Sequence, residues 1–391
     1  MAKWRFADLS MRVENPPAFP AAGNLLGYGV PDCSQPSYPG ALDTSGCPIR
    51  IARVVYSGTD SNVYELALVD GQWHWANLLQ VVQFSWTIST SSLERGAPYP
   101  ALSNPTAFVA SNVFPDTGVA MVVYQGYGGN IYLLSLYPDG WFWDNISTND
   151  GTTPPATPAV GRAFGYATDD GYNRVVYRGP DNFIYELSTA EVVWACNNLS
   201  TNDQAEPPAP LTAGDPFGYV TNDGVPRVIY RGTNGHIYEL HPEPYWRWND
   251  LSDISSAPPA VGDPFGYQTN DGTARVIYRD PEGQIIELAL LKRWESANLS
   301  TNNKAAPPAP PAAGNPFGYV TWDGIPRVIY RGTNGHIYEL HLESFWKWAD
   351  LSEISGAPPA AGDPFGYVIG DGIPRVIYRG TDNHVIELAL H

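Results

Sequence analysis

The 391-residue chain carries 22 Lys and Arg against 40 Asp and Glu, which gives a formal net charge of −18 at pH 7. This charge repels a phosphate backbone, so nucleic acid and anionic membrane surfaces are poor partners. Because no run of about eighteen apolar residues occurs and the start lacks the apolar stretch of a secretory signal, we expect no membrane insertion. The expected protein is soluble and is either cytoplasmic or released by a route without a signal peptide.

Four short motifs recur in the same order along the chain: a Gly-Tyr pair, an RVIYRG-like run, a HIYEL-like run and a Trp-containing run that ends in NLS or DLS. Neighbouring copies are 48 to 68 residues apart, measured on the tyrosine of the second motif. These tyrosines are Tyr56, Tyr124, Tyr177, Tyr230, Tyr278, Tyr330 and Tyr378. A unit near fifty residues with four short strands is typical of a propeller blade. The sequence therefore predicts an all-β fold, a seven-bladed β-propeller with four antiparallel strands per blade.

The two ends of the chain complement each other. The last repeat stops at HVIELALH without a Trp strand, whereas the chain begins with a Trp strand at Trp4 to Ser10. We expect residues 3–10 to form the outer strand of blade 7 and to close the ring, within a single domain over 1–391. The other boundaries are predicted at about 23–79, about 104–147, 161–200, 214–252, 262–300, 314–352 and 362–391 for blades 1 to 7.

Turn residues separate the predicted strands. Asp-Gly and Asn-Gly pairs such as Asp223-Gly224 and Asn234-Gly235 indicate hairpins. Pro-rich connectors such as Ala257 to Pro264 follow the fourth strands and suit the crossing between blades, because proline has no amide donor for a ladder. Eleven of the thirteen tryptophans lie in the fourth strands, which indicates packing between blades.

The repeat from Gly214 to Ser252, with its combined order of Gly-Tyr, RVxYRG, xIxEL and WxWxxLS, resembles the repeat of the Photorhabdus-type lectins. These are seven-bladed propellers that bind fucose and related sugars. The resemblance implies a non-enzymatic protein with glycans or glycoconjugates as partners and several similar sites in the clefts between blades. Blade 2 departs from the pattern at Ala107, Phe108, Met121, Gln125 and Leu133, so we expect fewer working sites than blades.

A sugar site needs a few fixed hydrogen-bonding groups beside an apolar wall. We predict hydroxyl partners in the arginines that end the second strands, in the glutamates of the third strands and in Asn222 of a first turn. The wall is predicted to be tryptophan. The arginines are Arg178, Arg231, Arg279, Arg331 and Arg379, the glutamates are Glu186, Glu239, Glu287, Glu339 and Glu387, and the tryptophans are Trp246, Trp322 and Trp346.

The same side chains also fit structural roles. A repeated Arg and Glu on adjacent strands is what a buried salt bridge looks like, and Trp322 at a loop tip also fits a partner contact. His236 and His241 lie five apart on one strand and point to opposite faces, so no metal and no cofactor is expected. Three sequons, at Asn145, Asn198 and Asn298, repeat at one strand end and predict a capping or turn role.

Cysteine is scarce, so no disulfide framework is expected. Cys33 and Cys47 bracket one Pro/Gly-rich loop and would bridge it in an oxidising compartment, whereas Cys196 is predicted to be a small core residue.

The sequence thus favours a multivalent lectin for fucose or related O-methylated sugars, whose weak sites gain strength on a glycan-coated surface. Two other functions remain open: a protein-interaction scaffold, and a lectin-like propeller enzyme with one unique pocket near blades 1 and 2. The absence of standard catalytic motifs argues against the enzyme. Homo-oligomerisation of the rings stays open.

Overall fold

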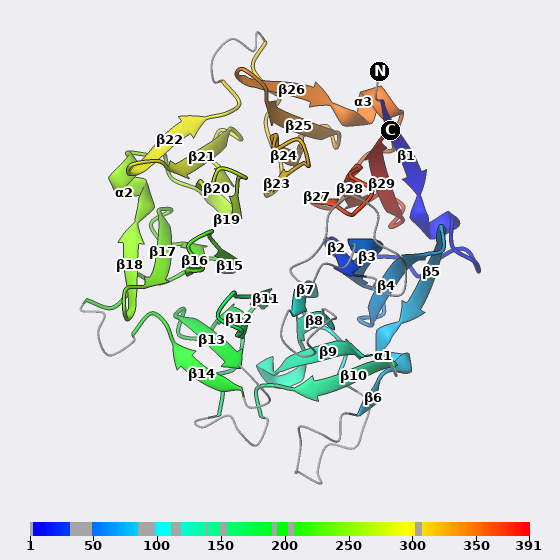
Figure 1. Cartoon of the computed structure of the whole chain (residues 1–391), viewed down its shortest axis with the longest axis horizontal. Coiled ribbons are helices and arrows are strands. Elements are labelled where there is room, and N and C mark those ends of the chain that lie inside the picture. The colour runs from blue at the N-terminus through cyan, green and yellow to red at the C-terminus, as the bar shows by residue number, and fades with distance from the viewer. Residues whose placement is uncertain are drawn as a thin grey trace.

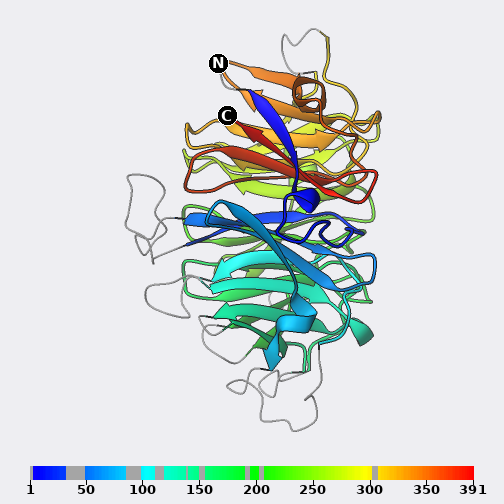
Figure 2. The same cartoon turned by 90° about the vertical axis from the view of Figure 1, so that its right-hand side faces the viewer.

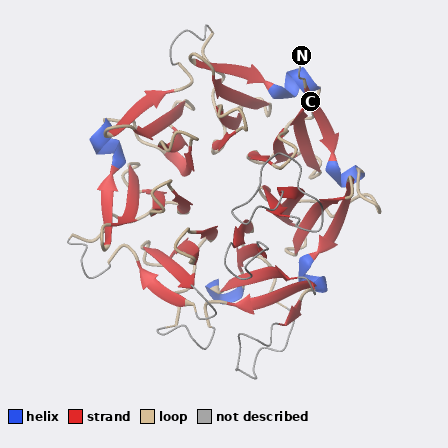
Figure 3. Ribbon diagram, in the orientation of Figure 1, coloured by secondary structure: helices blue, strands red, loops and turns tan. Residues whose placement is uncertain are grey.

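A computed structural model of the chain describes residues 3–31, 49–84, 98–110, 119–137, 140–148, 155–189, 194–201, 207–301 and 307–391. Seven β-sheets stand radially around a central axis (Figure 1), and the rim view of Figure 2 shows them stacked side by side. Strands dominate and the few helices are short (Figure 3). The predicted seven-bladed β-propeller is confirmed.

Each sheet is a blade whose strands run from the axis outward in chain order. Blade 1 contains β2 (Leu26–Pro31), β3 (Ile49–Ser57), β4 (Val63–Val69) and β5 (Gln72–Asn77). Blade 2 contains β7 (Thr106–Ala110), β8 (Val119–Gln125), β9 (Ile131–Tyr137) and β10 (Gly140–Asn145). Blade 3 contains β11 (Phe164–Ala167), β12 (Asn173–Arg178), β13 (Ile184–Thr189) and β14 (Ala195–Asn198). Blade 4 contains β15 (Phe217–Val220), β16 (Pro226–Arg231), β17 (Ile237–Pro242) and β18 (Trp246–Asp250).

The remaining blades follow the same order. Blade 5 contains β19 (Val261–Gln268), β20 (Ala274–Arg279), β21 (Ile285–Leu290) and β22 (Trp294–Asn298). Blade 6 contains β23 (Phe317–Val320), β24 (Pro326–Arg331), β25 (Ile337–Leu342) and β26 (Trp346–Asp350). Blade 7 contains β27 (Phe365–Val368), β28 (Pro374–Arg379) and β29 (Val385–Leu390). Short helices follow the outer strands at η1 (Leu9–Met11), α1 (Leu78–Val81), α2 (Leu251–Ser255) and α3 (Leu351–Ser355), and η2 (Tyr127–Gly129) forms a turn. Among the described residues, no helix combines the length and apolarity that crossing a bilayer requires.

The N-terminal strand closes the ring. β1 (Trp4–Asp8) pairs antiparallel with β29, from Trp4 opposite Leu390 to Asp8 opposite Ile386. It thereby becomes the outer strand of blade 7, as predicted, and Figure 1 shows both termini at this blade.

Blade 2 has one strand more than the repeat predicts. β6 (Gln83–Phe84), which follows blade 1 directly in the chain, pairs in parallel with β10 at the rim. The insertion after blade 1 therefore extends the outer edge of blade 2.

The Gly-Tyr motif is a contact between neighbouring blades. A Cβ on Gly266 would lie 2.7 Å from the ring of Tyr219 in the preceding blade. The glycine is needed because the neighbour's tyrosine occupies the space of its side chain. The same contact recurs between Tyr267 and Gly318 and between Tyr367 and Gly27. The motif thus sets the spacing of the inner strands.

The tyrosine of the RVIYRG motif anchors the preceding connector in six blades, whereas Tyr177 of blade 3 contacts Cys196. All seven of these side chains are fully buried. The phenol of Tyr230 donates to the carbonyl of Pro210 at 2.9 Å, and that of Tyr330 donates to Pro310 at the same distance. Because a buried hydroxyl must find a partner, the ring and the proline connector are fixed together.

The serine of the NLS/DLS motif ties the outer end of six blades to their third strands, whereas blade 1 has Leu79 at this place. The Ser252 hydroxyl accepts the Ile237 amide at 2.9 Å, and the Ser10 hydroxyl accepts the Val385 amide at 2.9 Å across the closing seam. The preceding Asp or Asn caps the following turn, as Asp250 does by accepting from the Asp253 amide. The sequon residues belong to this set, since Asn198 accepts from the Ser200 amide, so their predicted capping role is confirmed.

Candidate functional site

Six of the seven seams between blades contain the same polar cluster. Its members are the tyrosine of the first strand, the arginine that begins the RVIYRG run and the glutamate of the third strand. Arginine and glutamate are always twelve residues apart and their side chains lie 2.5 to 3.5 Å from each other. The pairs are Arg53 with Glu65, Arg174 with Glu186, Arg227 with Glu239, Arg275 with Glu287, Arg327 with Glu339 and Arg375 with Glu387.

The tyrosine completes the cluster from the innermost strand. Its phenol donates to the glutamate in several blades, at 2.9 Å from Tyr28 to Glu65 and at 3.1 Å from Tyr267 to Glu287. Burial, followed by the glutamate charge, raises the pKa of Tyr267 well above its ordinary value, so the phenol stays a donor.

In the cluster of Arg227 and Glu239, the opposite charge of the partner counteracts the effect of burial on the pKa values of the arginine and the glutamate. Burial opposes the guanidinium of Arg227, but Glu239 outweighs it and raises the pKa of the arginine. Burial also raises the pKa of Glu239, against the influence of Arg227. Each arginine is nevertheless not sealed off, since 7 to 13% of its side chain is exposed.

The seam between blades 2 and 3 shows that the fold does not need this cluster. Phe108, Met121 and Leu133 of blade 2 take the three positions and pack in one apolar cluster with Trp194. Buried ion pairs are poor sources of stability compared with such packing. The retention of the polar cluster in six seams therefore indicates a role other than holding the blades together.

A tryptophan from the next blade closes each seam from outside. Trp246 packs in the cluster of Tyr166, and Trp346 packs in the cluster of Tyr267. Trp346 is only 5% exposed, so it lies inside the seam, whereas Trp246 is partly exposed. The predicted packing of outer-strand tryptophans between blades agrees with these positions.

An open cavity lies beside the cluster of blade 7. It has a volume of about 300 Å³, lies on the outer strands β1 and β29, and is lined by Arg5, Arg12, Glu387, Ala389 and His391, together with Phe6 and Ala7. Ala389 lies opposite Arg375 in the ladder. In blade 6 the same place holds His341, whose ring lies against Glu339 at 3.4 Å. The small residue thus leaves room that the histidine fills.

The glutamates predicted for the site all belong to these clusters, but their partner is the arginine that begins each run. The glutamates do form salt bridges, as the structural alternative predicted, but the prediction of the trailing arginines, those that end the second strands, as their partners is wrong. Sequence reasoning missed the leading arginines as site residues, although the constant spacing of twelve residues between Arg and Glu was a visible signal.

The trailing arginines lie at the opposite end of the second strand, near the axis and away from the glutamates. Arg231 donates to the carbonyls of Gly262 and Ala213, and Arg178 donates to Asn182 of its own turn. Arg379 donates likewise to Asn383, and Arg331 faces Asp363 at 3.6 Å. Arg279 ends β20 at the equivalent place. These contacts show that the predicted arginines and glutamates do not form one site.

The first-turn residues form a third group. Asn222 lies against Gly272 of the next blade, 3.1 Å from where a Cβ would stand, and Trp322 occupies the same place against Gly372. Trp322 is 45% exposed, so its ring is free to meet a ligand or a partner on this face.

The histidines and cysteines take separate roles. His236 contacts Asp250 at 2.7 Å while His241 faces Glu239, so the two rings point to opposite sides, as predicted. Cys196 lies in β14, partly buried, and contacts the Tyr177 hydroxyl at 3.4 Å. The Cys33–Cys47 bridge falls outside the described residues.

Comparison with known proteins finds structures of similar fold but no matching sequence family. No protein-family model and no curated protein matches the chain. Among solved structures, AofleA from Arthrobotrys oligospora is 12% identical with a TM-score of 0.50, over 90% of each chain. The fucose-recognising six-bladed lectin of Aleuria aurantia is 13% identical over 82% of this chain and 95% of that one, with a TM-score of 0.49. A GH93 α-L-arabinofuranosidase of Fusarium graminearum is 11% identical over 97% and 96%, with a TM-score of 0.48. The likeness to AofleA is one of fold alone.

Proposed function

We propose that this protein is a multivalent carbohydrate-binding protein whose sites lie in the seams between blades. The observation that carries the proposal is the cavity beside Glu387 on the outer strands of blade 7, on the face that packs against blade 1. It places the Glu387 carboxylate, two arginines and a histidine around a space of about 300 Å³, which suits a monosaccharide.

The chemistry of the repeated cluster fits a sugar. A guanidinium offers several donors in one plane and a carboxylate offers acceptors, so together they hold a pair of hydroxyls. Because both groups are already fixed against each other, binding orders few further side chains. Six copies on one ring would convert weak single-site binding into strong attachment to a glycan-coated surface.

Fucose or an O-methylated relative is the sugar we propose, within a lectin of the Photorhabdus type. The support is the repeat resemblance, together with the recognition of fucose named for the Aleuria aurantia lectin. The seams with alanine beside the glutamate, namely those of Glu65, Glu287 and Glu387, are proposed to bind more readily than those where His241 or His341 fills the space.

Isothermal titration with methyl α-L-fucoside tests the proposal. We expect two or more equivalent sites in the wild type, and Glu387→Gln should remove one site from the fitted number while its melting temperature stays close to that of the wild type. Arg293→Met, whose parent side chain is 78% exposed, is the matched control and should bind as the wild type does.

Comparing Arg275→Met with Arg279→Met decides between the leading and trailing arginines as hydroxyl partners. Loss of a site only in Arg275→Met supports binding at the seam cluster. Loss of a site only in Arg279→Met would mean that the sugar binds at the other end of the strand. No binding of any fucoside, galactoside or O-methylated sugar on a glycan array would refute the lectin proposal and favour the interaction scaffold.

A further inference from the structure

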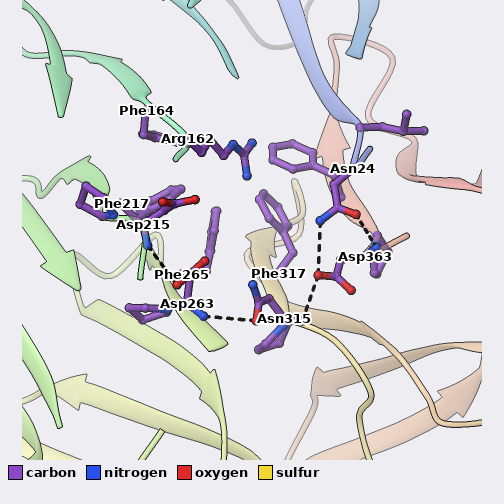
Figure 4. A pocket seen from close by; sticks show the side chains of 16 residues that line it. Asn24, Arg162, Phe164, Asp215, Phe217, Asp263, Phe265, Asn315, Phe317 and Asp363 are labelled. Atoms are coloured by element: carbon purple, nitrogen blue, oxygen red, sulfur yellow. Dashed lines mark hydrogen bonds between the residues drawn. The ribbon is translucent and has the colours of Figure 1, made fainter. Parts of the chain in front are cut away.

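The axis of the propeller contains a chamber that the seams do not use. It has a polar part of about 480 Å³ and a smaller part of about 90 Å³. Both parts share Asn24, Arg162, Asp215, Asp263 and Asn315 as lining residues. Figure 4 shows these side chains gathered around the smaller part, with phenylalanine rings beside them.

The ring of polar residues is built by reaching across blades. Each of these residues stands just before an inner strand, and each Asp or Asn side chain named below accepts a hydrogen bond from the backbone amide of the equivalent residue in the preceding blade. Asp263 accepts from Asp215 at 3.1 Å, Asn315 from Asp263 at 3.2 Å, and Asn24 from Asp363 at 2.9 Å. The preceding glycine makes this reach feasible, since a Cβ on Gly362 would lie 2.9 Å from the Asn24 oxygen.

Arg162 breaks the ring at one place. It occupies the position of the Asp or Asn in blade 3, and the residue before that position in blade 2 is Ser103 where six blades have glycine. A side chain there removes the space for a reaching oxygen. Arg162 instead extends toward the centre of the chamber (Figure 4), and its buried Nε has no hydrogen-bond partner.

The charges that line the chamber are separated. Among the described residues that line the chamber, Arg162 is the one cation, and Asp215, Asp263 and Asp363 form an acidic arc around it, of which Asp363 also faces Arg331 at 3.6 Å from outside the lining. Within the described residues, no carboxylate comes within the 4.0 Å of a salt bridge to the Arg162 guanidinium. Burial lowers the pKa of Arg162, and burial, followed by the charge of Asp215, raises the pKa of Asp263 to about 6, so burial outweighs the opposite charges around each of these two groups.

Behind the polar ring lies an apolar floor. Five phenylalanines form an arc in which neighbouring ring centroids are 3.8 to 4.1 Å apart. They are Phe164, Phe217, Phe265, Phe317 and Phe365. A ligand in the smaller part therefore meets charges at its rim and aromatic carbon beneath.

We propose that the axial chamber binds a small zwitterion of the amino-acid type, with its carboxylate on Arg162, its ammonium on the acidic arc and its apolar side chain over the phenylalanine floor. A ligand with only a positive charge would face Arg162, and one with only a negative charge would face three carboxylates. A ligand with both charges a few ångströms apart compensates both groups.

Isothermal titration with three matched probes tests this site: L-leucine, L-leucinamide, which lacks the carboxylate, and 4-methylpentanoate, which lacks the ammonium. We expect L-leucine to bind at least tenfold more tightly than either analogue at pH 7.5. Arg162→Met should abolish the preference of L-leucine over L-leucinamide, and Asp263→Asn should reduce its preference over 4-methylpentanoate. Arg293→Met is the control and should keep both preferences.

Three results would overturn the proposal: no heat from L-leucine at millimolar concentration, equal binding of L-leucinamide, or equal binding of 4-methylpentanoate. The melting temperature of each variant separates loss of the site from loss of the fold. Because the chamber lies apart from the seams, Arg162→Met should still titrate methyl α-L-fucoside as the wild type does, so failure of one site is distinguishable from failure of the other.

Discussion

Deleting residues 1 to 10 removes the strand that closes the ring, and the cost follows from what that strand buries. Trp4 is 7% exposed and Leu9 is fully buried. Burial of each such side chain contributes about 1.5 to 3 kcal/mol, so the two together contribute about 3 to 6 kcal/mol. The deletion also exposes the edge of β29 and removes the Asp8 contact with His384 at 2.8 Å, so this sum is a lower bound.

For a chain of this length each kcal/mol corresponds to about 1 °C, because the entropy of unfolding grows with the number of residues. We therefore expect the melting temperature of the truncated chain to fall by at least about 3 °C. Circular dichroism melts at one scan rate measure this, with Arg5→Ala as a control, since Arg5 lies on the same strand but is exposed. Unchanged melting of the truncated chain would show that blade 7 is stable without its outer strand, contrary to the reasoning.

Three further variants probe the repeat itself, each by urea unfolding. Gly266→Ala should cost about 1 to 3 kcal/mol, because its Cβ would stand 2.7 Å from the Tyr219 ring; a neutral result would mean that the blades separate freely. Ser252→Ala should cost about 1 to 3 kcal/mol, because it strands the buried Ile237 amide, and an equal loss from an exposed serine would contradict this. Because the pKa of Asp263 is raised to about 6, its protonated form stabilises the folded state below the ordinary carboxyl pKa. This stabilisation is lost as the pH rises through 6. The free energy of unfolding of Asp263→Asn, measured relative to that of the wild type, should therefore rise by about 1 to 3 kcal/mol as the pH goes from 4 to 7.5. If the free energies of unfolding of the two proteins vary with pH in parallel, the reasoning is refuted.

The architecture was predictable because a blade is a local unit. Its turns depend on residues such as Gly224, which has a φ of 73° at the first hairpin, and its strands on alternation along a few residues. Ring closure was also predictable, since the motif missing after Leu390 stands at Trp4. The fifth strand of blade 2 was not, because the two residues Gln83 and Phe84 carry no pattern of their own and pair only where β10 offers a free edge.

The site was predictable only in part. The glutamates were identified as polar groups at the right strand, but the arginine nearest to them in sequence, such as Arg231 for Glu239, is at the far end of the adjacent strand. The partner is Arg227, which stands two residues before Ile229, the residue opposite Glu239 in the ladder. Both arginines stand two residues from Ile229, which pairs with Glu239, so the strand register alone does not decide which of them meets the glutamate.

By itself the sequence determined the number of blades, the order of the strands and the way the ends join, because these rest on short-range periodicity and on counting motifs. Only the tertiary structure decided which side of each blade faces the next, which arginine meets which glutamate, and that Arg162 points into the axial chamber. Those outcomes depend on side chains from different blades competing for the same space, and that competition exists only once the seven sheets are packed around one axis.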